Sequence, residues 1–163
     1  MLDEYSVDKE KVLSWAEINL GALTHNVKRL HQHLRPGAQL MAVVKKNAYG
    51  HGAIPVAKSV LAAGAEWWGV HSLEEGLELR AAGITTPILI MGPILHSQAT
   101  VVLEKKLTPT VTETELASAL DSAAREVNTT TAVHVKVDTG LNCSVLVFRM
   151  LLVYYTLFPV WDG

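Results

Sequence analysis

The chain has 163 residues, of which 49% are apolar and 18% are charged, and its 14 basic and 16 acidic side chains leave a formal net charge of -2. This composition is typical of a globular domain and excludes collagen-like, coiled-coil and disordered chains. The near-neutral charge also lacks the positive excess that neutralises nucleic acid phosphates, so we expect no nucleic acid partner. At this length one domain is expected.

The two ends of the chain give information on its cellular location. Residues 1–5 are acidic and lack the apolar stretch of a secretory signal, and the single cysteine, Cys143, cannot form an internal disulfide. These features predict a cytoplasmic protein. Residues 145–161 are apolar apart from Arg149 and Thr156, but this run is shorter than the roughly 20 residues that span a membrane. We expect a buried segment or a tail foreign to the preceding domain, and no membrane span.

Hydrophobic patterns then predict the elements in chain order. Residues 15–20 alternate like a half-buried strand, and residues 21–34 form an amphipathic helix that ends before Pro36. Short apolar runs predict five further strands, at residues 40–44, 67–70, 88–91, 107–111 and 133–137. Helices are predicted between them at residues 53–63, 72–83 and 113–127, the second capped by Ser72 and the third by Thr112.

The spacing of these elements indicates the fold class. Several strands are almost continuously apolar, which is typical of a parallel sheet covered on both faces. Successive strands begin roughly 20 to 27 residues apart, a spacing that suits β/α units. The chain is therefore predicted to be an α/β protein. Periodicity alone leaves open whether the sheet is open or part of a barrel.

The segment that carries chemistry is residues 42–52, AVVKKNAYGHG. An apolar strand leads directly into Lys45, and a polar turn with two glycines follows. Because the carboxyl ends of parallel strands face the site in α/β folds, Lys45 is held on a rigid element there. A partly buried lysine loses its proton more readily, which favours Schiff-base chemistry. The residues by themselves leave open an ordinary surface lysine, which is our interpretation of Lys46.

This segment strongly resembles the cofactor-lysine motif of the pyridoxal-phosphate-dependent alanine racemases. In that family a lysine and a variable residue precede Asn-Ala-Tyr-Gly-His-Gly, as Lys45 and Lys46 do in this chain. Other segments resemble the same family in the same order, at residues 15–26, 74–84, 87–92 and 133–140. The resemblance covers about residues 13–142.

The resemblance implies a (β/α)8 barrel with a β-rich second domain, in a homodimer that interconverts L- and D-alanine for the bacterial cell wall. It implies pyridoxal 5'-phosphate as the cofactor, with Lys45 forming the aldimine and acting as an acid/base group at the substrate Cα. Tyr49 would reach the cofactor phosphate. Lys136 matches a lysine that the family often carbamylates, and Asp138 lies in the same cluster. No metal site is expected.

The chain also departs from the family. A complete barrel takes about 250 residues, so we expect a partial (β/α)8 TIM-type barrel of about five β/α units over residues 13–142. A divergent apolar tail follows at residues 143–163, and Cys143 stands where the family has an arginine. We therefore expect the chain alone to be inactive. The alternatives are a non-catalytic remnant that binds cofactor or a partner, and another amino-acid racemase of the same barrel group.

Overall fold

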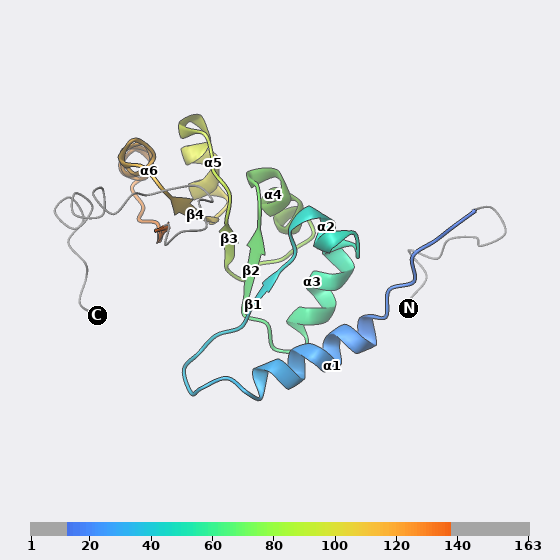
Figure 1. Cartoon of the computed structure of the whole chain (residues 1–163). Coiled ribbons are helices and arrows are strands. Elements are labelled where there is room, and N and C mark those ends of the chain that lie inside the picture. The colour runs from blue at the N-terminus through green and yellow to red at the C-terminus, as the bar shows by residue number, and fades with distance from the viewer. Residues whose placement is uncertain (1–12, 138–163) are drawn as a thin grey trace.

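The computed structural model describes residues 13–137, in which helices alternate with short strands (Figure 1). The helices are α1 (Leu20–His31), α2 (Lys45–Tyr49), α3 (Ala53–Leu61), α4 (Leu73–Ala81), the 3-10 turn η1 (His96–Gln98), α5 (Ala99–Glu104) and α6 (Thr114–Glu126). The strands are β1 (Met41–Val43), β2 (Trp67–Val70), β3 (Ile88–Ile90), β4 (Thr108–Val111) and β5 (His134–Val135). The five predicted strands of the apolar runs are confirmed, with ends that shift by up to two residues.

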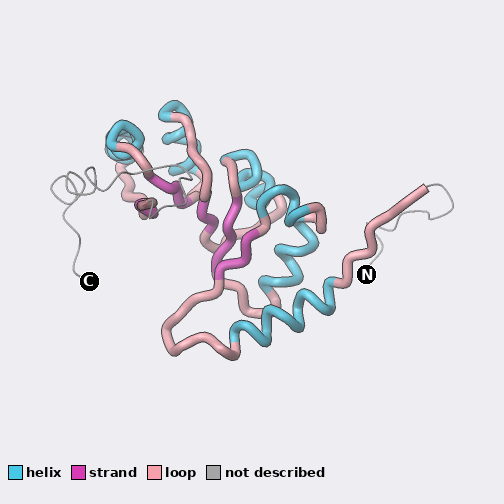
Figure 2. Tube along the Cα trace, viewed as in Figure 1, coloured by secondary structure: helices cyan, strands magenta, loops and turns pink. Residues whose placement is uncertain are grey.

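The strands form one sheet in the order of the chain. Each strand pairs in parallel with the next one, from β1 to β5. Figure 2 shows the strands side by side along the middle of the molecule, with helical segments between successive strands. A parallel strand cannot be reached by a tight hairpin, so each return requires a crossover of this kind. The predicted α/β class is confirmed.

The sheet is strongly curved. The rings of Trp67 in β2 and His134 in β5 have centroids 5.7 Å apart, although β3 and β4 lie between these two strands. In a flat sheet three strand spacings separate such residues by about 14 Å. The sheet therefore bends around the face that carries both rings, as the wall of a barrel does. This curvature confirms the predicted partial (β/α)8 TIM-type barrel.

The convex face of the sheet is buried under the helices. Trp68, Ile88 and Ile90 are 0% exposed and belong to one core cluster with residues of α3 to α6. Burial of each such side chain contributes roughly 1.5–3 kcal/mol to the free energy of unfolding. The indole of Trp68 also donates a 2.7 Å hydrogen bond to Thr86, so its one polar group is satisfied inside the core.

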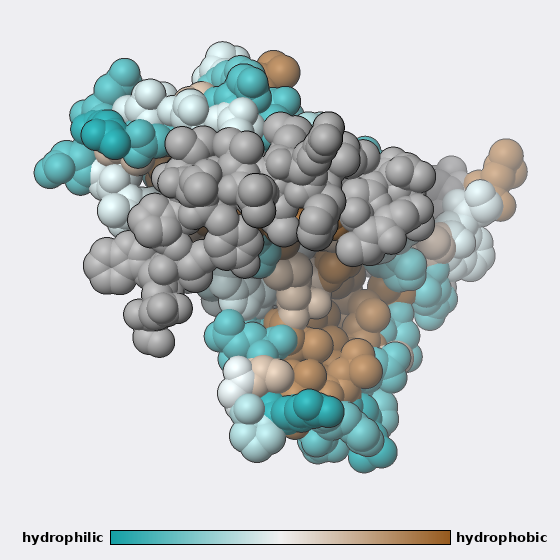
Figure 3. Space-filling model, turned by 60° about the vertical axis from the view of Figure 1, so that its left-hand side comes forward, coloured by the Kyte–Doolittle hydropathy of each residue, from teal (hydrophilic) through white to brown (hydrophobic). Residues whose placement is uncertain are grey.

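The concave face lacks such a layer within the described residues. Val43 in β1 is 38% exposed, and the register places it beside Gly69 and Leu89 on this face. A Cβ at Gly69 would lie 3.0 Å from the Met91 sulfur, so the glycine makes room for its neighbours. Figure 3 shows an apolar area left open on one side of the molecule.

The prediction of a strand at residues 15–20 is wrong. Residues 14–19 have no regular secondary structure, and Leu20 is the first residue of α1. Asn19 accepts a hydrogen bond from the N–H of Ala22 at 2.9 Å and so caps the helix. Alternation alone cannot make a strand without a neighbour to pair with, and no described strand pairs with this segment.

Two local details also differ from the sequence prediction. Glu113, and not Thr112, is the N-cap residue of α6, and its side chain makes no capping bond. The six-residue helix α5 was not predicted. Ala99, Val102 and Leu103 are its buried residues, and this i, i+3, i+4 pattern spans too few residues to identify a helix.

Candidate functional site

Lys45 lies where β1 ends. The preceding residue, Val44, is 3% exposed, and its N–H donates to the carbonyl of Gly69 at 2.8 Å, so the chain is anchored up to this point. Lys45 itself is partly buried. Within residues 13–137, its ammonium group has no carboxylate partner and no hydrogen bond. A partly buried amine without a partner, at the carboxyl end of a parallel strand, is available for a ligand.

The residues after Lys45 form a left-handed turn. Lys46, Asn47, Ala48 and Tyr49 have φ angles of 53°, 53°, 51° and 55°. This conformation costs roughly 1–2 kcal/mol for each residue other than glycine, so the turn must be held by its surroundings. Backbone strain of this kind is concentrated at functional sites. The turn ends at Gly50, whose φ of 86° suits glycine.

Local hydrogen bonds close this turn. The side-chain oxygen of Asn47 accepts from the N–H of Ala53 at 2.7 Å and so links the turn to the start of α3. Nδ1 of His51 lies 2.9 Å from the carbonyl oxygen of Ala48. The predicted polar turn is therefore a rigid structure in which Asn47 and His51 shape the backbone.

The other predicted site residues lie at the same edge of the sheet. Tyr49 belongs to the turn and is 61% exposed, and its hydroxyl has no hydrogen bond partner within residues 13–137. Lys136 follows β5, and its N–H donates to the carbonyl of Val111 at 3.0 Å. Because the strands are parallel, Lys45 and Lys136 both follow carboxyl ends. Asp138, Cys143 and the apolar tail at residues 143–163 lie outside the described residues.

Glu75 is a site residue that the sequence did not reveal. Its Oε1 accepts from the N–H of Lys46 at 2.8 Å, and its Oε2 accepts from the N–H of His71 at 2.6 Å. Partial burial raises the pKa of this carboxyl, but hydrogen bonds from the backbone N–H groups of His71, Lys46 and Ser72 outweigh it and hold the pKa below the ordinary 4.5. A local sequence pattern does not reveal this contact, because the partner in the turn is 29 residues away.

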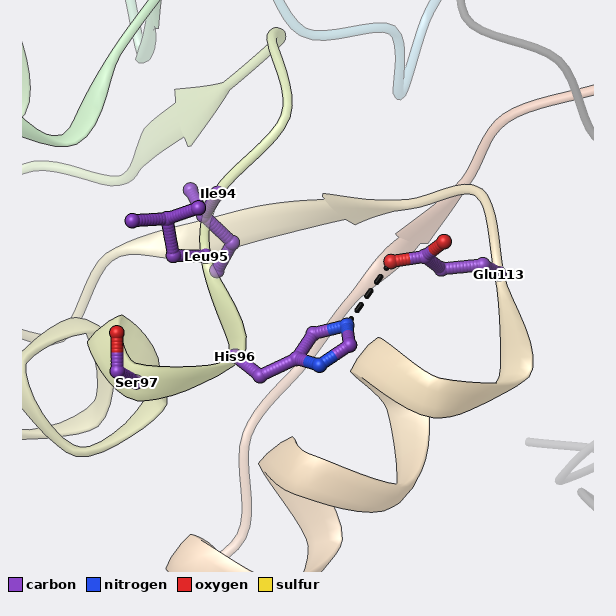
Figure 4. Close-up of a pocket in the computed structure, with 5 residues that line it drawn as sticks. All are labelled: Ile94, Leu95, His96, Ser97 and Glu113. Atoms are coloured by element: carbon purple, nitrogen blue, oxygen red, sulfur yellow. Dashed lines mark hydrogen bonds and ion pairs between the residues drawn. The ribbon is translucent and has the colours of Figure 1, made fainter.

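A surface depression lies near the carboxyl ends of β3 and β4. It has a volume of about 440 Å3 and is lined by Ile94, Leu95, His96, Ser97 and Glu113 (Figure 4). Nε2 of His96 lies 2.9 Å from Oε1 of Glu113, and the two side chains are 51% and 49% exposed. Such exposed pairs contribute about 0–1 kcal/mol to stability. None of the predicted site residues lines this depression.

Within residues 13–137, no group of three His, Cys, Asp or Glu side chains is arranged to hold a metal ion. None of the helices in this range has both the length and the apolar character needed to cross a membrane. Residues 145–161, the apolar run that we expect not to span a membrane, lie outside this range.

The curved parallel sheet and the lysine at the end of its first strand define a domain of the β/α-barrel class. The family model described as alanine racemase, N-terminal domain, matches residues 18–146 of this chain. The chain belongs to this family, as its motifs predicted.

Curated relatives agree with this assignment. The chain is 43% identical over 129 residues to alanine racemase 1 of Oceanobacillus iheyensis, a match that covers 79% of this chain and 34% of the relative. It is 45% identical over 127 residues to alanine racemase of Desulfovibrio desulfuricans, covering 78% of this chain and 34% of the relative. The chain thus spans about a third of the length of these relatives.

Solved structures share the fold. Alanine racemase of Clostridium difficile superposes with a TM-score of 0.78 at 34% identity, over 83% of this chain and 36% of that one. The Bacillus anthracis enzyme, solved with bound L-Ala-P, gives 0.77 at 35% identity, over 87% and 36%. Histidine racemase of Leuconostoc mesenteroides gives 0.76 at 31% identity, over 85% and 37%.

Proposed function

We propose that this chain carries the lysine-bearing part of a pyridoxal-phosphate-dependent alanine racemase, which interconverts L- and D-alanine. The observation that carries the proposal is the partly buried amine of Lys45 at the carboxyl end of β1, which has no partner among the residues that the structure describes. Relatives named alanine racemase, at 43% and 45% identity, support it.

The available side chains fit the chemical groups of pyridoxal 5'-phosphate, which presents an aldehyde and a phosphate. The amine of Lys45 suits the aldehyde, and the exposed hydroxyl of Tyr49 can donate a hydrogen bond to a phosphate oxygen. Lys136 adds a further cationic group at the same edge of the sheet. The bound cofactor supplies an electron sink for negative charge at the substrate Cα.

In this proposal Lys45 binds the cofactor and moves a proton at one face of the substrate Cα. The rigid turn limits the positions of its amine, and partial burial reduces contact with water. Racemisation requires a second acid/base group on the opposite face, and we assign no residue of the range 13–137 to that role. We therefore expect the chain alone to bind the cofactor without measurable turnover.

Chemical trapping tests the role of Lys45. The chain is mixed with pyridoxal 5'-phosphate, reduced with borohydride and digested, and fragment mass spectra distinguish Lys45 from Lys46. We expect the label on Lys45. Lys45→Ala should abolish it, whereas Lys58→Ala, which removes an exposed lysine of α3, should leave it unchanged. A label that persists at the same level in Lys45→Ala contradicts the assignment.

The alternative is another amino-acid racemase of the same barrel group, with a substrate such as histidine. The similarity to the histidine racemase supports it, because the TM-score of that match is close to those of the alanine racemases. Incubation with L-alanine and with L-histidine, followed by chiral chromatography, separates the possibilities. Trapping on Lys45 without either D-isomer agrees with the incomplete site or the non-catalytic remnant. Faster formation of D-histidine than of D-alanine favours another racemase of the barrel group.

The remaining expectations from the family also stay proposals. These are the homodimer, the supply of D-alanine for the cell wall and the cytoplasmic location. Light scattering of the purified chain tests the first, and cell fractionation tests the last.

A further inference from the structure

The turn after Lys45 is tied to a distant part of the chain by one side chain. Among the described residues, Glu75 on α4 is the one residue distant in sequence that forms a hydrogen bond with residues 46–49. Its Oε1 accepts from the N–H of Lys46 at 2.8 Å. Lys46 is the residue next to Lys45, so this bond fixes the peptide group that directly follows the amine-bearing residue.

Helix capping accounts for only one oxygen of Glu75. It is the third residue of α4, a position from which glutamate usually reaches back to an N–H at the start of its helix. Oε2 accepts instead from the N–H of His71, the residue before the N-cap Ser72, at 2.6 Å, and the hydroxyl of Ser72 accepts from the N–H of Glu75 at 3.4 Å. Oε1 is not needed for the cap, and it bonds to Lys46 instead.

We propose that Glu75 is a positioning residue that keeps the amine of Lys45 in place by joining the turn after β1 to the segment after β2. This inference rests on the proposed function of Lys45. The two strands are neighbours in the sheet, so one carboxylate can bond to both segments. Without Glu75 the left-handed turn can relax toward conformations that residues other than glycine prefer. That relaxation rotates the peptide group next to Lys45 and moves its amine.

The state of the carboxyl group supports this role. Its pKa lies below the ordinary value because the backbone N–H groups of His71 and Lys46 donate to it. The group is therefore ionised at neutral pH and can accept at both oxygens. Lys46 also carries a positive charge that favours the ionised form.

The test uses Glu75→Gln in the full chain. Glutamine has one acceptor oxygen and one donor nitrogen in place of two acceptors, so one of the two N–H groups loses its partner. Lysines are acylated with a neutral reagent at a series of pH values, and peptide mass spectrometry follows the products. This experiment measures the reaction rate of each lysine amine when no cofactor is bound. We expect the rate at Lys45 to rise about threefold and that at Lys58 to stay constant. Affinity for pyridoxal 5'-phosphate should fall by roughly tenfold.

Glu74→Gln is the matched control. Glu74 lies in the same turn of α4, is exposed, and its pKa is lowered by its own backbone N–H and by Ser72. Its replacement removes the same charge without touching the turn, so both readouts at Lys45 should match those of the wild type. If Glu75→Gln does not fold, Glu75→Asp keeps the charge but is one methylene too short to reach both segments.

The outcomes separate the two proposals. If Glu75→Gln is less stable but the acylation profile of Lys45 and the cofactor affinity stay unchanged, Glu75 only caps α4 and the inference is overturned. If the wild-type chain does not bind pyridoxal 5'-phosphate, the proposed function fails. The acylation profile then still shows whether Glu75 positions the amine.

Discussion

Helix α4 carries one charged anchor at each end, and the two anchors serve different parts of the molecule. In the first turn, the carboxylate of Glu75 accepts from the backbone N–H groups of Lys46, next to Lys45, and of His71, after β2. In the last turn, the guanidinium of Arg80 donates to four backbone carbonyls, those of Lys105, Ile84, Thr86 and Lys106, at 2.8–2.9 Å. Both signs of charge also suit the helix dipole.

The difference follows the general division of labour in β/α barrels, in which the carboxyl ends of the strands carry function and the amino ends carry stability. Arg80 ties together the loops that precede β3 and β4, where Lys106 alone among the non-glycine residues is left-handed, with a φ of 51°, whereas four consecutive residues are left-handed after Lys45. Burial lowers the pKa of Arg80, yet arginine stays charged at neutral pH. Glu75 instead holds a strained turn, so its removal should affect the site more than the free energy of unfolding.

The largest expected effect is the loss of the Arg80 anchor. Arg80→Met keeps much of the side-chain length but leaves four carbonyls without this donor. We expect the free energy of unfolding to fall by about 3 kcal/mol, because hydrogen bonds to charged groups contribute about 1.5–3 kcal/mol each and the exposed carbonyls regain water. Urea denaturation followed by circular dichroism measures this loss.

Arg125→Met is the control for Arg80. Arg125 pairs with Asp121 at 2.9 Å on the surface of α6, and its side chain is 79% exposed. Its replacement should change stability by about 0.5 kcal/mol or less. Equal losses for the two variants would contradict the role given to Arg80.

The sequence predicted most of the architecture because the apolar runs and helix signals are local. Lys45 was found because the strand before it and the turn after it are continuous in sequence. The role of Arg80 is not visible in the sequence, because the carbonyls it binds at Lys105 and Lys106 are 25 and 26 residues away. The second bond of Glu75 was missed for the same reason. Contacts between successive β/α units depend on packing, which a local pattern does not encode.

A substitution after β3, beside the segment that leads into α4, should have the second largest effect. Gly92 follows β3, and a Cβ at this position would clash with the backbone carbonyl of His71, whose N–H is bonded to Glu75. We expect Gly92→Ala to lower the free energy of unfolding by about 2 kcal/mol, within the range for overpacking. It should also weaken the protection of the Lys46 amide against hydrogen exchange. Unchanged exchange at Lys46 would show that the two segments are not coupled through Glu75.

The pH dependence of stability sharpens the comparison further. The folded-state pKa of Glu75 lies below the ordinary 4.5. The stabilisation of the fold by its carboxylate is therefore complete at pH values above the unfolded-state pKa and is lost as the pH falls through the folded-state pKa. Arg80 does not titrate in this range. We expect Glu75→Gln to remove roughly 1 kcal/mol near neutral pH and almost nothing at strongly acidic pH. Urea midpoints measured from neutral to acidic pH test this, and parallel curves for wild type and Glu75→Gln would contradict it.

The smallest effect is expected at the exposed pair of His96 and Glu113, which lies at the same end of the sheet as Glu75 but bonds to no strained backbone. The two side chains are about half exposed, so water competes for their hydrogen bond and side-chain entropy opposes it. Glu113→Gln should change the free energy of unfolding by less than about 0.5 kcal/mol. Urea denaturation followed by circular dichroism measures this change. If Glu113→Gln lowers the free energy of unfolding as much as Glu75→Gln does, any side-chain contact at this end of the sheet stabilises the fold to the same extent. The hydrogen bonds of Glu75 to the backbone would then not explain the effect of its replacement.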